Sequence, residues 1–465
     1  MDVAPDWIPV GVILAVLLGL GAIGYEVLRY RLFAYELTEE TLNIDSGVLF
    51  RRKREIPLGR IQNVDMTRSI VQRVLGITAV GIETAGGSDT EASLQFVSVP
   101  EAKRLQEGIR TRKRRLEGAA ETGDAEAETV TGKSAAASEA EVVFSLDDES
   151  LVLYSLLSFD PRVASVLFVV VPFGAPFLSE YVKGLTPVII VGFGLFVFMA
   201  VGSAMWLLSA FARFVGYYGF TLTRVGEELR YERGLLKRYD GSIPEGKIQT
   251  VLIEENLPMR HFGYASLAIE TAGYGPGSAS DSESAVPLAS REDLLELARE
   301  VEPFGELDFT RPAPVAKRRY AFRYGILVTT LLGIGVVVSR VVMPFPWYGL
   351  AVLYAAVPIA ARKKWIHRGW ELSADYVRTR TGFWRRRTHV VPVDRVQTVI
   401  DRRTLFQRRW HLGTVVIDTA SSAGFVSPEA RAIDIGEDEA ERLREQVADR
   451  LLISLGLRDP ETVPT

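Results

Sequence analysis

The chain has 465 residues, no cysteine and a formal net charge of −4. Without cysteine, the chain has no disulfides, thiolate metal sites or cysteine nucleophiles, and its four histidines are too few for a multi-histidine metal centre. The near-neutral charge argues against a dedicated nucleic-acid-binding protein. Because 48% of the residues are hydrophobic and 24% are charged, the apolar residues must be concentrated in particular segments.

Five apolar runs divide the chain. They cover 7–28, 163–178, 185–211, 324–342 and 347–361. A helix of about 20 apolar residues crosses a bilayer core. Buried helices of a soluble protein are the alternative, but the basic residues that flank the runs favour membrane helices. The sequence therefore predicts a transmembrane helix at 7–28 and two transmembrane hairpins, at 163–211 and 323–361.

The charges around these runs predict their orientation. Basic residues follow the first run and flank the outer ends of both pairs, whereas the short loops within each pair carry few charges. Since Lys and Arg collect on the cytoplasmic side, we expect a multi-pass protein of the plasma membrane. Its N-terminus lies outside, and its large polar regions and C-terminus lie in the cytoplasm.

The three large polar regions are copies of one unit, here termed repeats 1, 2 and 3. They lie at 30–117, 212–305 and 362–457. Each copy has a Gly 15 residues before a shared glutamine and a Pro five residues before it. An Arg follows the glutamine by 11 residues, and an acid–Thr–Ala triplet starts 21 residues after it. Constant offsets of so many residue types define an internal repeat.

Each repeat has the pattern of several short strands followed by one helix. Alternation of apolar and polar residues predicts strands of repeat 1 at 42–45, 48–58, 61–66 and 79–84. Amphipathic helices are predicted at the ends of the three repeats, at 100–116, 290–301 and 437–455. These elements predict a small barrel or sandwich that a C-terminal helix covers.

The repeated pattern resembles a known family. Repeat 1 reads Ser-Gly-x-Leu, Ile-Pro-x-x-Arg-Ile-Gln-x-Val, Arg-x-x-Gly and Glu-Thr-Ala. This is similar to the bacterial pleckstrin-homology-like domain of the membrane-flanked type, and the whole chain resembles YdbS/YdbT-like membrane proteins. The resemblance implies a partly open, seven-stranded barrel with a C-terminal helix, and no enzyme activity. Members often begin with a helix pair, whereas one apolar run precedes repeat 1 here.

The expected fold class is therefore membrane α + β, with five transmembrane helices alternating with three pleckstrin-homology-like β-barrel domains. Two segments complete the domain plan. The acidic, Ala- and Glu-rich segment 118–142 is predicted to be a disordered linker. Segment 143–160 is predicted to be an amphipathic helix that lies on the membrane surface.

The basic residue and the glutamine of each repeat form the first set of candidate binding residues. They lie two positions apart on a strand and therefore share a face, where a cation beside an amide can hold an anion or a partner's backbone. The alternative is a structural role in the fold. The residues are Arg60, Gln62, Lys247, Gln249, Arg395 and Gln397.

The basic tip of the second predicted strand forms the second set. Its residues are Arg51, Arg52, Lys53 and Arg54 in repeat 1, and Arg385, Arg386 and Arg387 in repeat 3, with Lys237 and Arg238 in repeat 2. A basic residue near an anionic leaflet gains about 1 kcal/mol, so these tips are candidates for contact with lipid headgroups. A solvated hairpin is the alternative.

No phosphate-binding loop, metal-ligand spacing or nucleophile motif is present, so no catalytic residue, metal or cofactor is expected. The sequence favours a non-enzymatic membrane scaffold whose cytoplasmic domains bind protein or peptide partners, or anionic lipid headgroups. The alternative is a transport or lipid-handling protein with regulatory domains. Since the runs lack central ionisable groups, that alternative is disfavoured. The pattern leaves the oligomeric state open.

Overall fold

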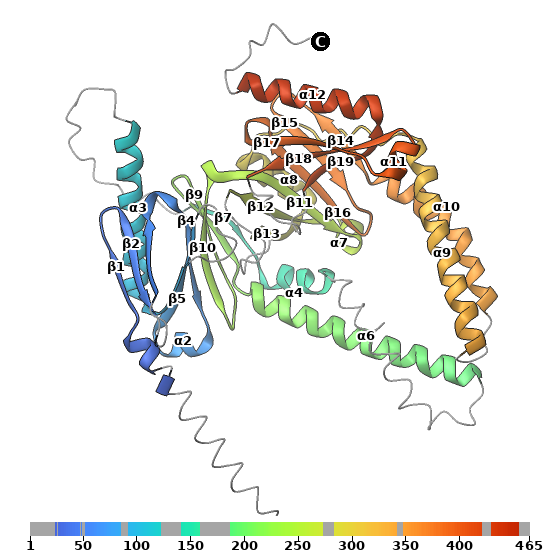
Figure 1. Cartoon of the computed structure of the whole chain (residues 1–465). Helices are drawn as coiled ribbons and strands as arrows, with labels where there is room; N and C mark the ends of the chain where they lie inside the picture. The colour runs from blue at the N-terminus through green and yellow to red at the C-terminus, as the bar shows by residue number, and fades with distance from the viewer. Residues whose placement is uncertain are drawn as a thin grey trace, which may run out of the picture. The chain divides into compact units, whose positions relative to one another are not determined.

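The computed structural model describes most of the chain (Figure 1). The described residues are 24–121 except 26, 47, 49–51 and 85–91, followed by 141–158, 187–272, 283–341, 347–420 and 429–454. The chain divides into two compact units. Unit 1 is Met1–Ser138 with Lys237–Ser242, and unit 2 is Glu139–Leu236 with Ile243–Thr465.

Repeat 1 lies in unit 1 and consists of two antiparallel sheets and a helix. The first sheet has β1 (Ala34–Leu37), β2 (Thr41–Ser46) and β3 (Arg52–Pro57) in that order. The second has β4 (Ile61–Arg68), β5 (Ile77–Thr84) and β6 (Ala92–Ser98), followed by α3 (Val99–Glu121). A single 3-10 turn, η1 (Leu58–Arg60), links the sheets, and a short helix, α2 (Ile70–Val74), links β4 to β5. The strands and the helix predicted for this repeat are confirmed.

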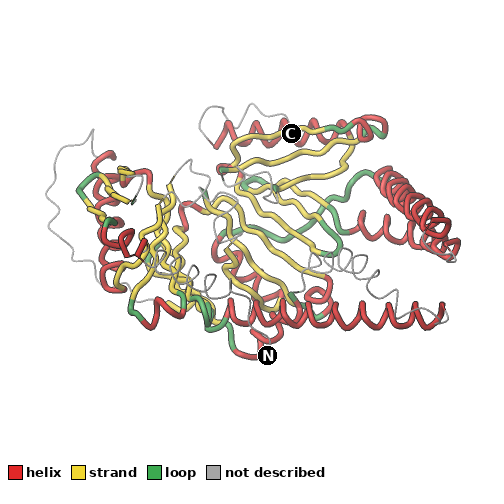
Figure 2. The backbone as a smooth tube through the Cα atoms, turned by 60° about the horizontal axis from the view of Figure 1, so that its bottom comes forward, coloured by secondary structure: helices red, strands yellow, loops and turns green. Residues whose placement is uncertain are grey.

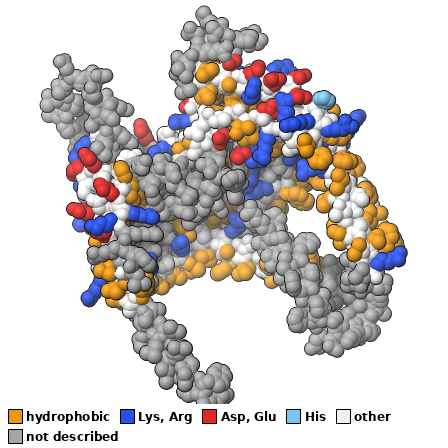
Figure 3. Space-filling model, viewed as in Figure 1, with side chains coloured by type: hydrophobic (Ala, Val, Ile, Leu, Met, Phe, Trp, Pro, Cys, Tyr) orange, Lys and Arg blue, Asp and Glu red, His pale blue; other side chains and the backbone are white. Residues whose placement is uncertain are grey.

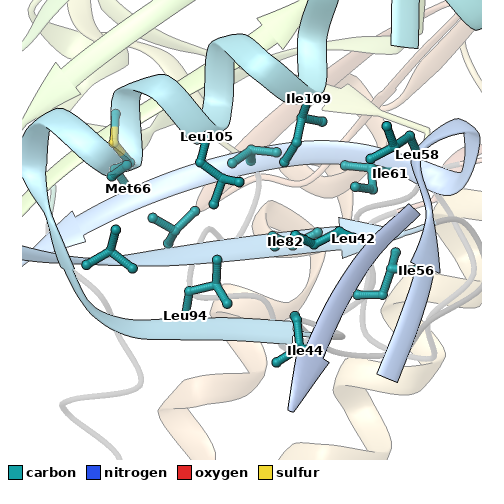
Figure 4. Packing of buried hydrophobic residues seen from close by; sticks show 14 residues of the cluster. Leu42, Ile44, Ile56, Leu58, Ile61, Met66, Ile82, Leu94, Leu105 and Ile109 are labelled. Atoms are coloured by element: carbon teal, nitrogen blue, oxygen red, sulfur yellow. The ribbon is translucent and has the colours of Figure 1, made fainter. Parts of the chain in front are cut away.

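The core of repeat 1 lies between the sheets and α3 (Figure 4). Leu42 and Ile44 alternate along β2, so both point inward, and Ile82 of β5 lies opposite them. Leu105 and Ile109, one helical turn apart, cover this core from α3. Burying each such side chain contributes about 1.5–3 kcal/mol, which explains why the apolar face of α3 closes the repeat.

Repeat 2 has the same order of elements. They are β8 (Thr221–Val225), β9 (Glu228–Arg233), β10 (Arg238–Pro244), η2 (Glu245–Lys247), β11 (Ile248–Asn256), α7 (Leu257–His261), β12 (Tyr264–Thr271), β13 (Glu283–Ser290) and α8 (Arg291–Val301). Repeat 3 lies wholly in unit 2. Its elements are β14 (Gly369–Leu372), β15 (Tyr376–Thr381), β16 (Arg385–Pro392), η4 (Val393–Arg395), β17 (Val396–Arg402), α11 (Leu405–Arg409), β18 (Leu412–Thr419), β19 (Ala430–Gly436) and α12 (Glu437–Ser454).

The repeated glycine has a clear structural cause at the β15–β16 turn. Gly382 has φ +91°, and a Cβ there would collide with the carbonyl oxygen of Arg385. Gly234, at the same position of repeat 2, also has a positive φ. Only glycine adopts this conformation without a steric penalty, so the turn requires it.

The expected β-barrel is not closed in the described residues. In repeats 1 and 3, the first three strands form one sheet and the last three another, joined by a 3-10 turn instead of a ladder. In repeats 1 and 2 a strand of the next repeat occupies the edge of the fourth strand, whereas the two sheets of repeat 3 are separate without such a strand among the described residues. β4 pairs with Arg238–Asp240 of β10 within unit 1, and β11 pairs with β16 within unit 2.

The helix expected at 143–160 differs from the structure. Its first residues form a strand, β7 (Glu141–Ser145), which pairs with β8 of repeat 2. The helix α4 runs from Asp148 to Leu157. It begins at Asp148 because the Asp147 carboxylate accepts a hydrogen bond from the Ser150 N–H and caps the helix. Local sequence could not reveal β7, since its partner strand lies more than 70 residues later.

Four helical segments carry the apolar runs of the described residues (Figure 2). They are α6 (Pro187–Tyr217), α9 (Val315–Val341), η3 (Trp347–Val352) and α10 (Leu353–Ile366). Within them, Phe196–Tyr217 and Val315–Val337 are long and apolar enough to cross a membrane. Only 6% and 17% of their most apolar windows are buried in protein, which argues against core helices. Hydrophobic side chains cover the outer surface of the α9–α10 hairpin (Figure 3).

The five expected spans are therefore only partly accounted for. The spans at 7–28 and 163–178 fall mostly or wholly outside the described residues, as does most of the 118–142 linker. The fifth, at 347–361, is divided between η3 and α10. The 14 residues of α10 reach only about 21 Å, less than the roughly 30 Å of a bilayer core.

Candidate functional site: a basic cluster where repeats 2 and 3 meet

Repeats 2 and 3 are joined by the antiparallel pairing of β11 and β16. The register places Glu254 opposite Arg387 and Glu255 opposite Arg386. Eight of the nine residues of β11 are buried, although the strand ends in two acidic residues before Asn256. A buried carboxylate is tolerated only when it is paired, so the acids of β11 require the cations of β16.

The carboxylates of β11 are fully engaged by arginines. Glu255, whose side chain is 2% exposed, accepts two hydrogen bonds of 2.6 Å from Arg386 and lies 3.5 Å from Arg291. Glu254 accepts from Arg385 and, at 2.7 Å, from Arg387. Burial by itself raises the pKa of Glu254, but the two arginines outweigh it and hold this pKa below its usual value. Glu254 is therefore ionised at neutral pH.

Further basic side chains lie beside this pair, and two of them contact Phe383 in the β15–β16 turn. The guanidinium of Arg260 donates to the Phe383 carbonyl at 3.3 Å and lies 5.6 Å from its ring centre. The His367 ring centre is 5.3 Å from that of Phe383. Arg380 stacks on Phe309 at 4.3 Å, and its buried Nε has no hydrogen-bond partner among the described residues.

We term Arg260, Arg291, His367, Arg380 and Arg386 the basic cluster. Burial and the surrounding guanidinium groups, including Arg260 and Arg386, lower the pKa of His367 to about 4. Burial and Arg386 likewise lower the pKa of Arg380 to about 10. Burial followed by Arg386 also lowers the pKa of Arg260. Burial is the largest cause of these shifts, and neighbouring guanidinium groups add to it. Positive groups held close together in this way favour the binding of an anion.

The cluster lies at the end of the α9–α10 hairpin. His367 directly follows α10, and the last turns of that helix carry Arg362, Lys363 and Lys364. Basic residues that flank an apolar hairpin are typical of the level of the lipid headgroups. No group of three or more potential metal ligands occurs in the described part of the chain.

The predicted basic tips have different surroundings in repeats 1 and 3. Arg385, Arg386 and Arg387 bind the carboxylates of β11. Lys53 and Arg54 are exposed on β3, with the Lys53 ammonium 3.7 Å from Asp45. The side chains of Arg51, Arg52, Arg60 and Gln62 lie outside the described residues. In repeat 2, Lys237 lies 4.8 Å from the ring centre of Tyr239.

The basic residue and glutamine of the repeat also differ between copies. Gln249 is buried and donates to the Lys247 carbonyl at 3.4 Å, as expected for a structural role. Gln397 is exposed, and Arg395 lies 3.3 Å from Asp394. The structure thus brings neither pair together with the basic cluster. Sequence reasoning assigned no binding role to four of its members, Arg260, Arg291, His367 and Arg380.

A second buried polar group connects the hairpin to repeat 3. Asp434 is 1% exposed and binds Arg319 of α9. It also accepts from the Tyr320 hydroxyl at 2.6 Å, from Arg368 at 3.1 Å and from Gln407 at 2.9 Å. Asp434 has φ +61°, a conformation that Asp tolerates better than most residues. The group fixes α9 against repeat 3, and the basic flank of the run was its only sequence signal.

Two short helices at equivalent places expose apolar side chains. In α2, the side chains of Val71 and Val74 are 67% and 83% exposed. In α11, those of Leu405 and Phe406 are 80% and 66% exposed. Exposed apolar groups at the same place in two repeats indicate a surface for contact with lipid or protein.

Comparisons with known proteins agree with this architecture. A family model for the bacterial PH domain matches residues 3–113, 166–304 and 322–451. Each match covers one repeat with all or part of the apolar segments before it. The UPF0699 transmembrane protein YdbT of Bacillus subtilis (strain 168) is 25% identical over 434 residues, which cover 89% of this chain and 84% of that protein. No solved structure matches the chain. The chain therefore belongs to the bacterial PH domain family, as a membrane protein in which this domain is repeated.

Proposed function

We propose that this protein is a non-enzymatic membrane scaffold whose repeats lie in the cytoplasm, and that its basic cluster binds the phosphate of anionic lipid headgroups. The observation that carries the proposal is the charge of the cluster. Four guanidinium groups, of Arg260, Arg291, Arg380 and Arg386, interact with the buried carboxylate of Glu255, which Arg386 and Arg291 already engage. The positive charge of Arg260 and Arg380 is left for an external anion.

The place of the cluster supports lipid over a soluble anion. His367 follows the hairpin directly, so the site lies within a few residues of an apolar helix end. The exposed apolar side chains of α11, in the same repeat, suit the boundary between headgroups and acyl chains. Arginine is suited to phosphate because its planar guanidinium donates two parallel hydrogen bonds.

Binding is tested with the full chain in nanodiscs of phosphatidylcholine, alone or with phosphatidylglycerol. An anion beside His367 stabilises the imidazolium, so the anionic lipid should raise the His367 pKa above about 4. The four histidines of the chain can be assigned by NMR with single His→Gln variants. Arg380→Gln should reduce the lipid-induced shift, whereas Arg54→Gln, which removes an exposed charge outside the cluster, should leave it unchanged. Equal responses of the two variants exclude this site.

Orientation is tested separately. Since the chain has no cysteine, Glu292→Cys on α8 introduces a unique, exposed thiol in repeat 2. In intact cells an impermeant maleimide should not react with it, and after permeabilisation it should. Labelling of intact cells would place repeat 2 outside the membrane and contradict a cytoplasmic scaffold.

A further inference from the structure

The fourth strand of a repeat has one edge that the repeat itself does not cover. In repeat 1, within unit 1, β4 pairs along this edge with β10, the third strand of repeat 2. In repeat 2, within unit 2, β11 pairs along the same edge with β16, the third strand of repeat 3. In repeat 3 the equivalent strand is β17, which pairs only with β18 among the described strands.

The two occupied edges have the same register. Met66, four residues after the shared glutamine of repeat 1, pairs with Asp240, nine residues before the glutamine of repeat 2. Val251, two residues after the glutamine of repeat 2, pairs with Val390, seven residues before the glutamine of repeat 3. In both pairs the distance from the glutamine on the added strand exceeds that on the fourth strand by five residues. The added strand therefore has the same register in both ladders.

No strand of the described residues covers the free edge of β17. Leu252 of β11 is 0% exposed, whereas Ile400, its equivalent in β17, is 44% exposed. Gln249 is buried in β11, and Gln397 is exposed in β17. An exposed apolar side chain beside an unpaired strand edge is the arrangement to which extended segments bind by strand addition.

The charges at the C-terminal end of β17 determine which kind of segment can pair with it. β11 ends in Glu254 and Glu255, which the arginines of β16 engage. At the same two positions β17 has Arg402, which is exposed, and the chain continues with Arg403, which already donates to the carboxylates of Asp401 and Glu437. Arg402 is therefore the main charge that a partner meets, and Arg403 adds to it. The sign of the charge is reversed, and opposite charges directly across a ladder stabilise the pairing of strands.

We propose that β17 binds an extended segment of a protein partner with consecutive acidic residues followed by apolar ones, antiparallel and in the register of the other two edges. The acids lie opposite Arg402 and Arg403, and a residue two positions past them lies opposite Ile400. This partner surface is distinct from the basic cluster and does not depend on lipid binding there.

A second copy of this chain fits the edge less well. Its β3 is the equivalent of β10 and β16, and the shared register sets Arg52 opposite Arg402. The next pair is Arg51 opposite Arg403. The β4–β10 ladder has one such pair, Arg68 opposite Arg238. Two in succession oppose the pairing, because like charges directly opposite destabilise a ladder.

The test uses the full chain in nanodiscs and a synthetic peptide. The peptide Glu-Glu-Glu-Thr-His-Val-Val-Pro has the sequence of β16 with its three arginines replaced by glutamate. The unchanged sequence, Arg-Arg-Arg-Thr-His-Val-Val-Pro, is the control. Fluorescence anisotropy should show about tenfold tighter binding of the acidic peptide. The preference should reverse in the double variant Arg402→Glu, Arg403→Glu.

Crosslinking locates the peptide, since the chain has no cysteine of its own. With Ile400→Cys, an acidic peptide with cysteine in place of its histidine should form a disulfide. With cysteine in place of its threonine, one position away and on the opposite face, the yield should be much lower. Equal yields, or no reversal in the double variant, overturn the proposal. A disulfide between Ile400→Cys in one copy and Arg54→Cys in a second also overturns it, because β3 then occupies the edge.

Discussion

β11 and β17 are the same strand of the repeat in two different surroundings. β11 has a neighbouring strand on both sides, and its acids are buried against arginines of the next repeat. Among the described strands β17 has one neighbour, and it exposes Ile400 and carries arginine where β11 carries glutamate. The difference shows that a paired neighbouring strand, and not the place in the repeat, decides whether this strand is buried. Four predictions test this contrast.

Removal of the buried charge at the paired edge should have the largest effect. Glu255→Gln leaves Arg386 and Arg291 without their carboxylate in a site where Glu255 is 2% exposed. Loss of one partner of a buried ion pair costs about 3–5 kcal/mol, so the free energy of unfolding of unit 2 should fall by this amount. Denaturant unfolding measures it. A loss below about 1 kcal/mol would show that this junction does not depend on the pair.

The apolar positions of the two strands form a matched test. Leu252→Ala should cost about 2–5 kcal/mol, because it removes a fully buried side chain and leaves a cavity. Ile400→Ala, at the equivalent position of β17, should cost less than about 1 kcal/mol, because that side chain is 44% exposed. Similar losses of stability would mean that β17 is covered in the folded protein.

The pH dependence of stability should reflect the cations beside β11. His367 has a pKa of about 4 in the folded protein against 6.5 ordinarily, because of burial and the surrounding arginines. Between these values the unfolded chain binds a proton that the folded chain does not. Stability should therefore fall as the pH drops from 6.5 to about 4. Thermal unfolding of His367→Gln should show a smaller decrease, and His411→Gln, which alters an exposed ring, serves as the control. An unchanged pH profile in His367→Gln contradicts the assignment.

Arg402→Gln should have the smallest effect on stability. Arg402 is exposed at the open end of β17, and exposed substitutions usually change stability by less than about 0.5 kcal/mol. The same substitution should weaken binding of the acidic peptide, so stability and binding are expected to separate at this residue. A larger loss of stability would show that Arg402 has a structural partner, and the two strands would then differ less than proposed.

Much of the repeat was predictable because its signals are local. Alternation placed β2 to β5, the amphipathic pattern placed α3, α8 and α12, and constant offsets related the three copies. Gly382 marked a turn that needs a positive φ. Arg385, Arg386 and Arg387 were singled out as a basic tip, but their partners could not be, because Glu254 and Glu255 lie about 130 residues earlier in the chain.

The sequence by itself determined the three repeats, the apolar segments between them and the family, since these depend on residue type and spacing along the chain. The tertiary structure decided which strand covers which edge and where β7 pairs. It also decided that Asp434 forms ion pairs with Arg319 and Arg368. It also assembled the basic cluster from repeats 2 and 3 and left β17 open. These features arise from contacts between distant segments, and a repeated local pattern is the same whether its edge is covered or free.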